Sequence, residues 1–155
     1  MYSKMLMAMD ESDLSRHTLQ QAIELAQSLS ARLRVVHVID MSWLPIGPEI
    51  AIDTTALSAA RRSAGNTLIA VACETARLAG IELEADLIET ETLVQHVAEA
   101  IAGEATRWGA DLLVMGTHGR RGFQYLLLGS VAERTLRHSL VPVLLIPPAK
   151  EMTTA

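Results

Sequence analysis

The chain has 155 residues, half of them apolar and one fifth charged, which is enough for one globular domain with a sizeable core. Its formal net charge of −5 argues against a nucleic-acid-binding protein, because such proteins usually carry a basic surface. The single cysteine excludes an internal disulfide, and no apolar run approaches the roughly 20 residues of a membrane-spanning helix. We therefore expect a cytoplasmic protein with no membrane span.

The first part of the chain alternates strand-like and helix-like segments. Lys4 to Met9 is a short apolar run that predicts a buried strand, and the polar turn residues Asp10 to Asp13 follow it. Apolar residues recur at helical spacing from Leu14 to Leu29, and Leu33 to Ile39 predicts a second strand. Residues 41–55 carry two prolines and a glycine, which predict a loop or lid.

The alternation continues to the end of the chain. Three further helices are predicted: an alanine-rich one at residues 55–79 that Gly80 ends, and two with helical spacing of apolar residues at 92–108 and 131–138. The second of these begins with Thr92-Leu93-Val94-Gln95, which fits a capping box. Strand patterns occupy residues 81–88, 112–115 and 141–146, and the last of them is interrupted by Pro142.

This order of elements predicts the fold class. Strands that alternate with helices imply an α/β protein with a doubly wound, five-stranded parallel sheet and four helices. The acidic third strand and the proline-bearing fifth strand suit the edges, which gives the strand order 3-2-1-4-5. We expect one nucleotide-binding domain at residues 1–147 and a flexible tail at 148–155. Such sheets bind ligands where the winding direction reverses, so Asp10 and Gly116 should face each other across one crevice.

The densest group of glycines follows the fourth predicted strand. Gly116 to Ser130 reads Gly-Thr-His-Gly-Arg-Arg-Gly-Phe-Gln-Tyr-Leu-Leu-Leu-Gly-Ser and holds four of the nine glycines. Glycines allow a close backbone approach to a ligand, and the first amides of the next helix lack intrahelical acceptors. This order of strand, loop and helix predicts a phosphate site, with a nucleotide as the expected ligand. Arg120 lies inside the loop, where its charge could neutralise the phosphates.

Three polar residues also have a purely structural interpretation. Asp10 suits the N-cap of the first helix as well as a place in the crevice. Ser130 to Glu133 fits a capping box, so the Ser130 hydroxyl could cap the helix, bind a phosphate, or do each in turn. His37 has no partner at metal-ligand spacing, which favours solvation or a satisfied hydrogen bond in the core.

The spacing of the glycines is similar to that of a known family. Gly116-Thr117-His118-Gly119, nine further residues and Gly129-Ser130 match the motif of the ATP-binding branch of the universal stress protein family. The similarity extends over essentially the whole chain and includes the strand-like segments Met7 to Asp10, Val36 to Ile39 and Pro142 to Ile146.

The resemblance implies a role for individual residues. It places the phosphates on four positions of the motif, namely Gly116, Gly119, Gly129 and Ser130. It places Asp10 near the ribose and base, and Val38 beside the adenine. It also implies ATP with Mg²⁺ or Mn²⁺, in which the metal is held mainly by the phosphates. Homodimers that form through Val143 to Ile146 are a further implication.

The functional hypothesis is an ATP-binding regulatory protein of the stress response that acts through nucleotide occupancy and through dimer or partner contacts. No catalytic or metal-ligating residue is assigned, and the chain lacks the Gly-Lys-Ser/Thr motif of efficient phosphoryl transfer, so we expect at most slow ATP hydrolysis. Two alternatives are an AMP or cyclic-nucleotide binder and an interaction module that needs no nucleotide.

One segment departs from the family pattern. Family members often carry a Gly-x-Pro turn after the third strand, where this chain reads Glu89-Thr90-Glu91-Thr92. Two carboxylates at this place could weaken nucleotide binding by repulsion, or could hold a metal ion.

Overall fold

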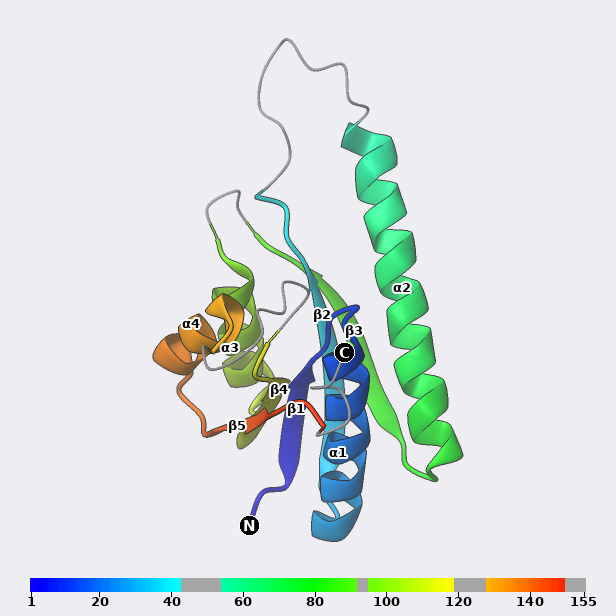
Figure 1. Cartoon of the computed structure of the whole chain (residues 1–155), viewed down its shortest axis with the longest axis vertical. Helices are drawn as coiled ribbons and strands as arrows, with labels where there is room; N and C mark the ends of the chain where they lie inside the picture. Colours follow the sequence, from blue (N-terminus) through cyan, green and yellow to red (C-terminus); the bar gives the residue numbers. More distant parts are fainter. Residues whose placement is uncertain (43–53, 92–94, 119–127, 150–155) are drawn as a thin grey trace.

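The computed structural model describes residues 1–42, 54–91, 95–118 and 128–149. Nine helices and strands follow one another in these residues, in strict alternation (Figure 1). The strands are β1 (Lys4–Ala8), β2 (Arg32–Ile39), β3 (Leu83–Glu89), β4 (Leu112–Gly116) and β5 (Val143–Ile146). The helices are α1 (Asp13–Leu29), α2 (Thr54–Leu78), α3 (Val97–Trp108) and α4 (Ser130–His138). Residues 150–155, which belong to the predicted tail, and most of the predicted loop at 41–55 lie outside the described residues.

The strands form one parallel sheet with β1 at its centre. The order is β3-β2-β1-β4-β5, which confirms the predicted fold class and strand order. Met7 of β1 pairs with Val35 of β2 on one side and with Val114 of β4 on the other. The buried centre of a parallel sheet favours continuous apolar runs, and Met5, Leu6 and Met7 are completely buried.

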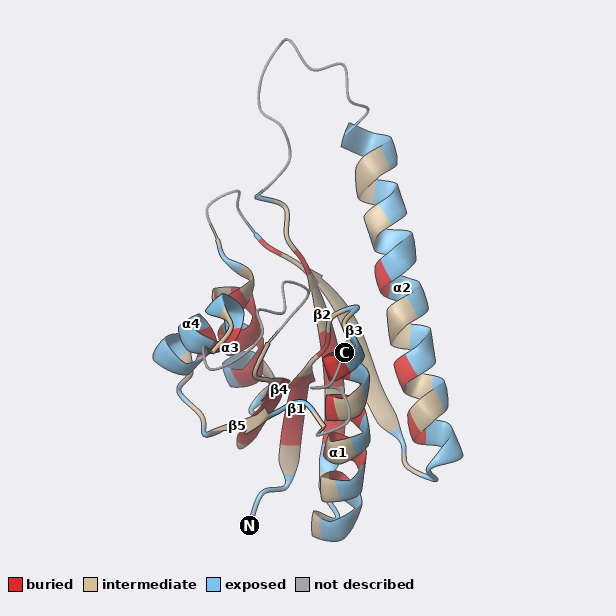
Figure 2. Ribbon diagram, in the orientation of Figure 1, coloured by how far each residue is buried: buried red, intermediate tan, exposed pale blue. Residues whose placement is uncertain are grey.

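Helices cover both faces of the sheet. Figure 1 shows α1 and α2 on one side, and α3 and α4 on the other. Since successive side chains of a strand point to opposite faces, the residues of β1 divide between two cores. Met5 and Met7 belong to the core under α1 and α2, and Leu6 belongs to the core under α3. Figure 2 shows the buried residues concentrated in the sheet and on the inner sides of the helices.

Backbone geometry and local hydrogen bonds set the helix ends. Ser30 follows α1 with a φ of 53°, and its N–H bonds to carbonyls of the last turn, which ends the helix. The start of α3 differs from the prediction: residues 92–94 lie outside the described part, and Gln95 and His96 are not helical. Glu99 accepts a hydrogen bond from the backbone N–H of His96 at 3.4 Å, so the helix begins at Val97.

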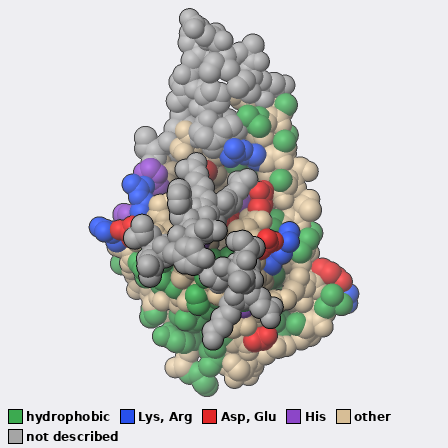
Figure 3. Space-filling view, in the orientation of Figure 1, with side chains coloured by type: hydrophobic (Ala, Val, Ile, Leu, Met, Phe, Trp, Pro, Cys, Tyr) green, Lys and Arg blue, Asp and Glu red, His purple; other side chains and the backbone are tan. Residues whose placement is uncertain are grey.

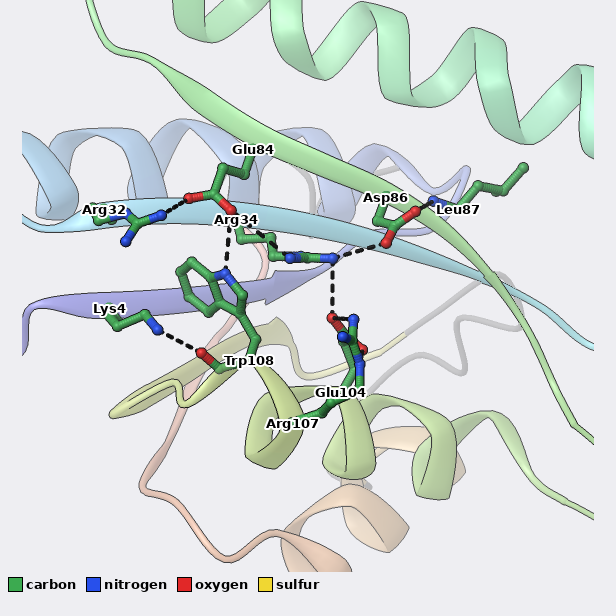
Figure 4. Close-up of polar contacts among 9 residues, drawn as sticks. All are labelled: Lys4, Arg32, Arg34, Glu84, Asp86, Leu87, Glu104, Arg107 and Trp108. Atoms are coloured by element: carbon green, nitrogen blue, oxygen red, sulfur yellow. Dashed lines mark hydrogen bonds and ion pairs between the residues drawn. The ribbon is translucent and has the colours of Figure 1, made fainter.

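A charged cluster lies between the sheet and α3 (Figure 4). Arg34 of β2 binds Asp86 of β3 at 2.8 Å and Glu104 of α3 at 3.1 Å, and the side chains of Arg34 and Glu104 are only 14% and 6% exposed. Arg107 adds a contact of 2.6 Å to Glu104 from the outer side of the helix. The indole N–H of Trp108 donates to Glu84 of β3 at 3.2 Å. These contacts fix α3 against the two strands.

None of the helices among residues 1–42, 54–91, 95–118 and 128–149 combines the length and the apolar character needed to cross a bilayer.

Candidate functional site

The sequence predicts a crevice at the carboxyl ends of β1 and β4. These strands are neighbours, and the helices that follow them, α1 and α4, leave toward opposite faces of the sheet. Gly116 at the end of β4 lies against the first turn of α1, where a Cβ atom on Gly116 would stand 3.0 Å from Cγ of Leu14. The absence of a side chain at Gly116 thus allows the end of β4 to approach α1 closely. This arrangement is a topological switch point, the usual ligand position in such sheets.

Asp10 follows β1 and is held in a tight polar turn. Its Oδ1 atom accepts hydrogen bonds from the N–H of Ser12 at 2.9 Å and from the Ser12 hydroxyl at 2.5 Å. Its own N–H donates to the hydroxyl of Ser15 at 2.8 Å. The interpretation of Asp10 as the N-cap of α1 is wrong, because Ser12 is the N-cap and accepts from the N–H of Ser15 at 3.1 Å.

Ser12 and Ser15 were not among the predicted site residues, although they determine how Asp10 is presented. A sequence signal for them existed. Asp readily accepts a hydrogen bond from the backbone two residues further on, so Asp10-Glu11-Ser12 is a pattern that predicts such a turn.

The two ends of the glycine-rich loop meet. The N–H of Gly129 donates to the carbonyl of Thr117 at 2.8 Å, which brings the start of α4 next to the end of β4. Thr117 also contacts the edge strand β5, because its N–H donates to the carbonyl of Ile146 at 3.0 Å. Gly116 and Gly129 are thus close to one another as the motif requires. Gly119 and Arg120 lie outside the described residues.

Ser130 is exposed and is the first residue of α4. The capping-box interpretation is wrong here, because the N-cap is Gly129, which has no side chain, and Ser130 is already the first residue of the helix. The Gly129 carbonyl already accepts the N–H of Glu133 at 2.9 Å, so the helix turns from Gly129 onward. The N-cap residue therefore contributes no side chain to the first amides of α4, which lie next to the end of β4.

Val38 lies near the carboxyl end of β2, two residues beyond Val36. Both belong to the apolar core on the α3 side of the sheet, where Val36 is fully buried and Val38 is half-buried. Ile88 of β3 is the register partner of Val38 and packs on the same core. Val38 therefore offers an apolar surface at the end of the sheet that carries Asp10.

The carboxylate of Glu89, in the segment that departs from the family pattern, has a cationic partner. The Arg62 guanidinium of α2 binds both Glu89 oxygens, and one of these contacts measures 3.1 Å. The hydrogen bond from Arg62 holds the pKa of Glu89 below its usual value. The charge that the sequence suggested as a source of repulsion is therefore offset locally. In the part of the chain that the structure describes, no group of three His, Cys, Asp or Glu residues is placed to hold a metal.

Comparisons with known proteins agree with this architecture. A universal stress protein of Methanocaldococcus jannaschii is 30% identical over 151 residues, which cover 97% of this chain and 85% of the relative. The crystal structure of a universal stress protein family member from Burkholderia pseudomallei has a TM-score of 0.78 and 37% identity, and the match covers 95% of this chain and 97% of that one.

A third match is to a solved structure with a bound nucleotide. The universal stress protein of Archaeoglobus fulgidus in complex with dAMP has a TM-score of 0.65 at 23% identity, and the match covers 94% of this chain and 98% of that one. Its likeness to this chain is one of fold. The family model of the universal stress protein family matches residues 1–147, which include every helix and strand described above. With its topological switch point, its glycine motif and this match, the chain belongs to the universal stress protein family.

Proposed function

We propose that the protein is an ATP-binding regulator of the stress response, and that the nucleotide occupies the crevice between β1 and β4. The hydrogen bond between Thr117 and Gly129 carries this proposal. It brings the end of β4 and the start of α4 together, so that a phosphate between them can reach the first amides of α4. Helix N-termini bind phosphates because their N–H groups lack partners and the helix dipole favours negative charge there.

The phosphates are assigned to Gly116, Gly119, Gly129 and Ser130. Two observations support the described positions: Ser130 is exposed at the first turn of α4, and the N-cap of this helix is Gly129, which has no side chain. Gly119 and Arg120 are assigned from the motif alone. In this arrangement Arg120 offsets the charge of the phosphates.

The nucleoside is assigned to Asp10 and Val38. Both hydrogen bonds from Ser12 end on Oδ1 of Asp10, so Oδ2 is the atom we assign to a ribose hydroxyl. The apolar side chain of Val38 suits one face of the adenine. The metal, Mg²⁺ or Mn²⁺, is assigned to the phosphates and water, because nucleotide-bound Mg²⁺ usually keeps several waters and few protein ligands.

A second candidate ligand is AMP or a cyclic nucleotide. It is favoured by the dAMP complex of the fold relative from Archaeoglobus fulgidus, a nucleotide with a single phosphate. Asp10 and Val38 would bind the nucleoside of either ligand. The ligands differ in how far their phosphates extend along the glycine-rich loop.

Self-association through β5 is the second part of the proposal. The Pro142 carbonyl accepts from Leu113 of β4 at 2.9 Å, and the Ile146 carbonyl accepts from Thr117, just after β4, at 3.0 Å. The N–H groups of Val143 and Leu145 therefore point away from the sheet. An apolar edge strand with free N–H groups tends to pair with another chain. Figure 3 shows hydrophobic side chains gathered in the lower left of the view, the part that β5 occupies in Figure 1.

A thermal unfolding scan with ATP and Mg²⁺, AMP or cyclic AMP tests nucleotide binding. A ligand at about 100 times its Kd adds roughly 2.7 kcal/mol of stability. For a domain of this size we expect a rise in Tm of roughly 5–10 °C. Asp10→Asn should weaken binding about tenfold, because Asn keeps the Oδ1 acceptor of the turn and loses the carboxylate charge.

The matched control is Asp13→Asn, which removes an equal charge from an exposed residue three positions further along. Its nucleotide affinity should equal that of the unchanged protein. If none of the three nucleotides shifts Tm in a saturable way, the proposal is wrong and an interaction module independent of nucleotide remains. A phosphate-release assay on the same samples should give slow or negligible hydrolysis.

A further inference from the structure

His37 makes a polar contact next to the proposed site that the assignment above does not use. It lies on β2 just before Val38, and its Nδ1 atom is 2.8 Å from the carbonyl oxygen of Met9. A carbonyl oxygen can only accept, so Nδ1 carries the proton and donates. The interpretation of His37 as a histidine with a satisfied hydrogen bond is confirmed by this contact.

The bonded carbonyl belongs to the peptide that leads into Asp10. The ladder between β1 and β2 ends at Ala8, and beyond it the N–H of Met9 still donates to Val36 at 2.8 Å. Both backbone groups of Met9 therefore bond to β2. Its N–H donates to the carbonyl of Val36, and its carbonyl accepts from the ring of His37. Since the Met9 carbonyl and the Asp10 N–H share one peptide plane, the ring orients the start of the Asp10 turn.

Helix α2 packs closely over this ring. A Cβ atom at Gly65 would stand 3.2 Å from Cδ2 of His37 and 2.6 Å from Cδ1 of Leu87, the register partner of His37 on β3. Gly65 is buried in the middle of α2, where glycine costs about 1 kcal/mol relative to alanine. The close approach that glycine permits places the imidazole and the Leu87 side chain next to each other against the backbone of α2.

We propose that His37 is a positioning residue of the nucleotide site, which fixes the Met9–Asp10 peptide and thereby aims the Asp10 carboxylate at the nucleoside. This inference rests on the proposed function. It predicts a division within the site. The His37 contact acts on the nucleoside end through Asp10, whereas the phosphate end depends on β4 and α4. Loss of the contact should weaken the binding of adenosine nucleotides and leave the binding of inorganic tripolyphosphate unchanged.

Two substitutions separate the hydrogen bond from the packing. His37→Leu keeps an apolar side chain of similar reach and removes the donor, whereas the amide N–H of His37→Asn can take the place of Nδ1–H. We expect His37→Leu to weaken nucleotide binding about three- to tenfold, the equivalent of one hydrogen bond. His37→Asn should restore most of the affinity. In the Asp10→Asn background, His37→Leu should add less than a twofold further loss, because its effect passes through Asp10.

A measurement without nucleotide accompanies this comparison of single and double variants. The ¹⁵N shifts of the His37 ring in the ligand-free protein should report the Nδ1–H tautomer. Amide exchange of Asp10 and Ser12 should be faster in His37→Leu and unchanged in His37→Asn. An Nε2–H tautomer, or equal nucleotide affinity in His37→Leu and the unchanged protein, overturns the role of His37 and leaves the proposed function intact. An unchanged protein that binds no nucleotide overturns the proposed function, and the positioning role with it.

Discussion

Single polar side chains join segments that are remote in the sequence. Asp111, just before β4, accepts hydrogen bonds from the N–H and hydroxyl of Ser3 at 2.8 Å each, and from the N–H of Lys4 at 3.0 Å. Its own N–H donates to the Lys4 carbonyl at 2.9 Å. One carboxylate therefore aligns the beginnings of the two central strands.

We expect Asp111→Asn to lower the free energy of unfolding by about 1 kcal/mol at neutral pH, since Asn offers one acceptor oxygen in place of two. Burial raises the pKa of Asp111, but the hydrogen bonds from Ser3 and Lys4 outweigh it, so the pKa lies below its usual value. A lowered carboxylate pKa contributes stability above the unfolded value of about 3.9 that is lost as the pH falls further.

Tm measured from neutral pH down to about pH 3 checks this expectation, and the difference between the two proteins should shrink through the acid range as Asp111 protonates. Glu82→Gln, at an exposed position, is the control for the loss of one negative charge. A difference that stays constant with pH would contradict the role assigned to the Asp111 carboxylate.

The positions of site residues could be predicted where strand order sets them, and could not be predicted where they depend on a contact between segments remote in the sequence. The places of Asp10 and Gly116 at neighbouring strand ends followed from the strand order. That Gly129 and not Ser130 is the N-cap of α4 could not be predicted, because the start of α4 involves the tertiary contact between Gly129 and Thr117. The pairing of Glu89 with Arg62 is also non-local, since it requires α2 to lie beside β3.

At the scale of elements, α3 depends on the buried charge of Glu104. We expect Glu104→Ala to lower the free energy of unfolding by about 3 kcal/mol, because it leaves Arg34 buried with fewer partners. Arg107→Ala removes the exposed partner of the same carboxylate and should cost less than about 1 kcal/mol.

Denaturant titration of both variants measures these effects. Equal losses in the two would show that burial of the Arg34–Glu104 pair does not set the stability of α3. A double variant with Arg34→Met and Glu104→Leu should recover much of the loss, because a well-packed apolar pair can replace a buried ion pair.

Apolar patterning, together with the alanine content of α2, predicted the type and order of the helices and strands that the structure describes, because the sheet is buried at its centre and covered by helices. It was less able to fix their ends. The predicted strand at 141–146 begins two residues later in the structure, since Pro142 has no N–H and contributes only its carbonyl to the ladder. The start of α3 differed in that Gln95 and His96 are not helical and the helix begins at Val97, where Glu99 accepts from the N–H of His96.

At the scale of the whole molecule, the proposed dimer depends on the outer N–H groups of β5. We expect Leu145→Pro to abolish dimerisation and leave the monomer folded, because the N–H it removes points away from β4. Leu145→Ala keeps this N–H, so it serves as the control for the loss of the side chain. Sedimentation velocity over a range of concentrations distinguishes the two. Dimers in Leu145→Pro, or monomers in the unchanged protein, would contradict pairing through this edge.

The central place of β1 has a consequence for how the protein is made. β1 is synthesised before the other four strands of the sheet, yet one of its neighbours is β4, whose Val114 pairs with Met7. At the speed of translation, one edge of this apolar strand waits roughly 5–20 seconds for its partner. During that interval the backbone groups of β1 that later bond to β4 have no strand to pair with. It is therefore the segment of the nascent chain most in need of protection against aggregation, and the arrival of β4 ends its exposure.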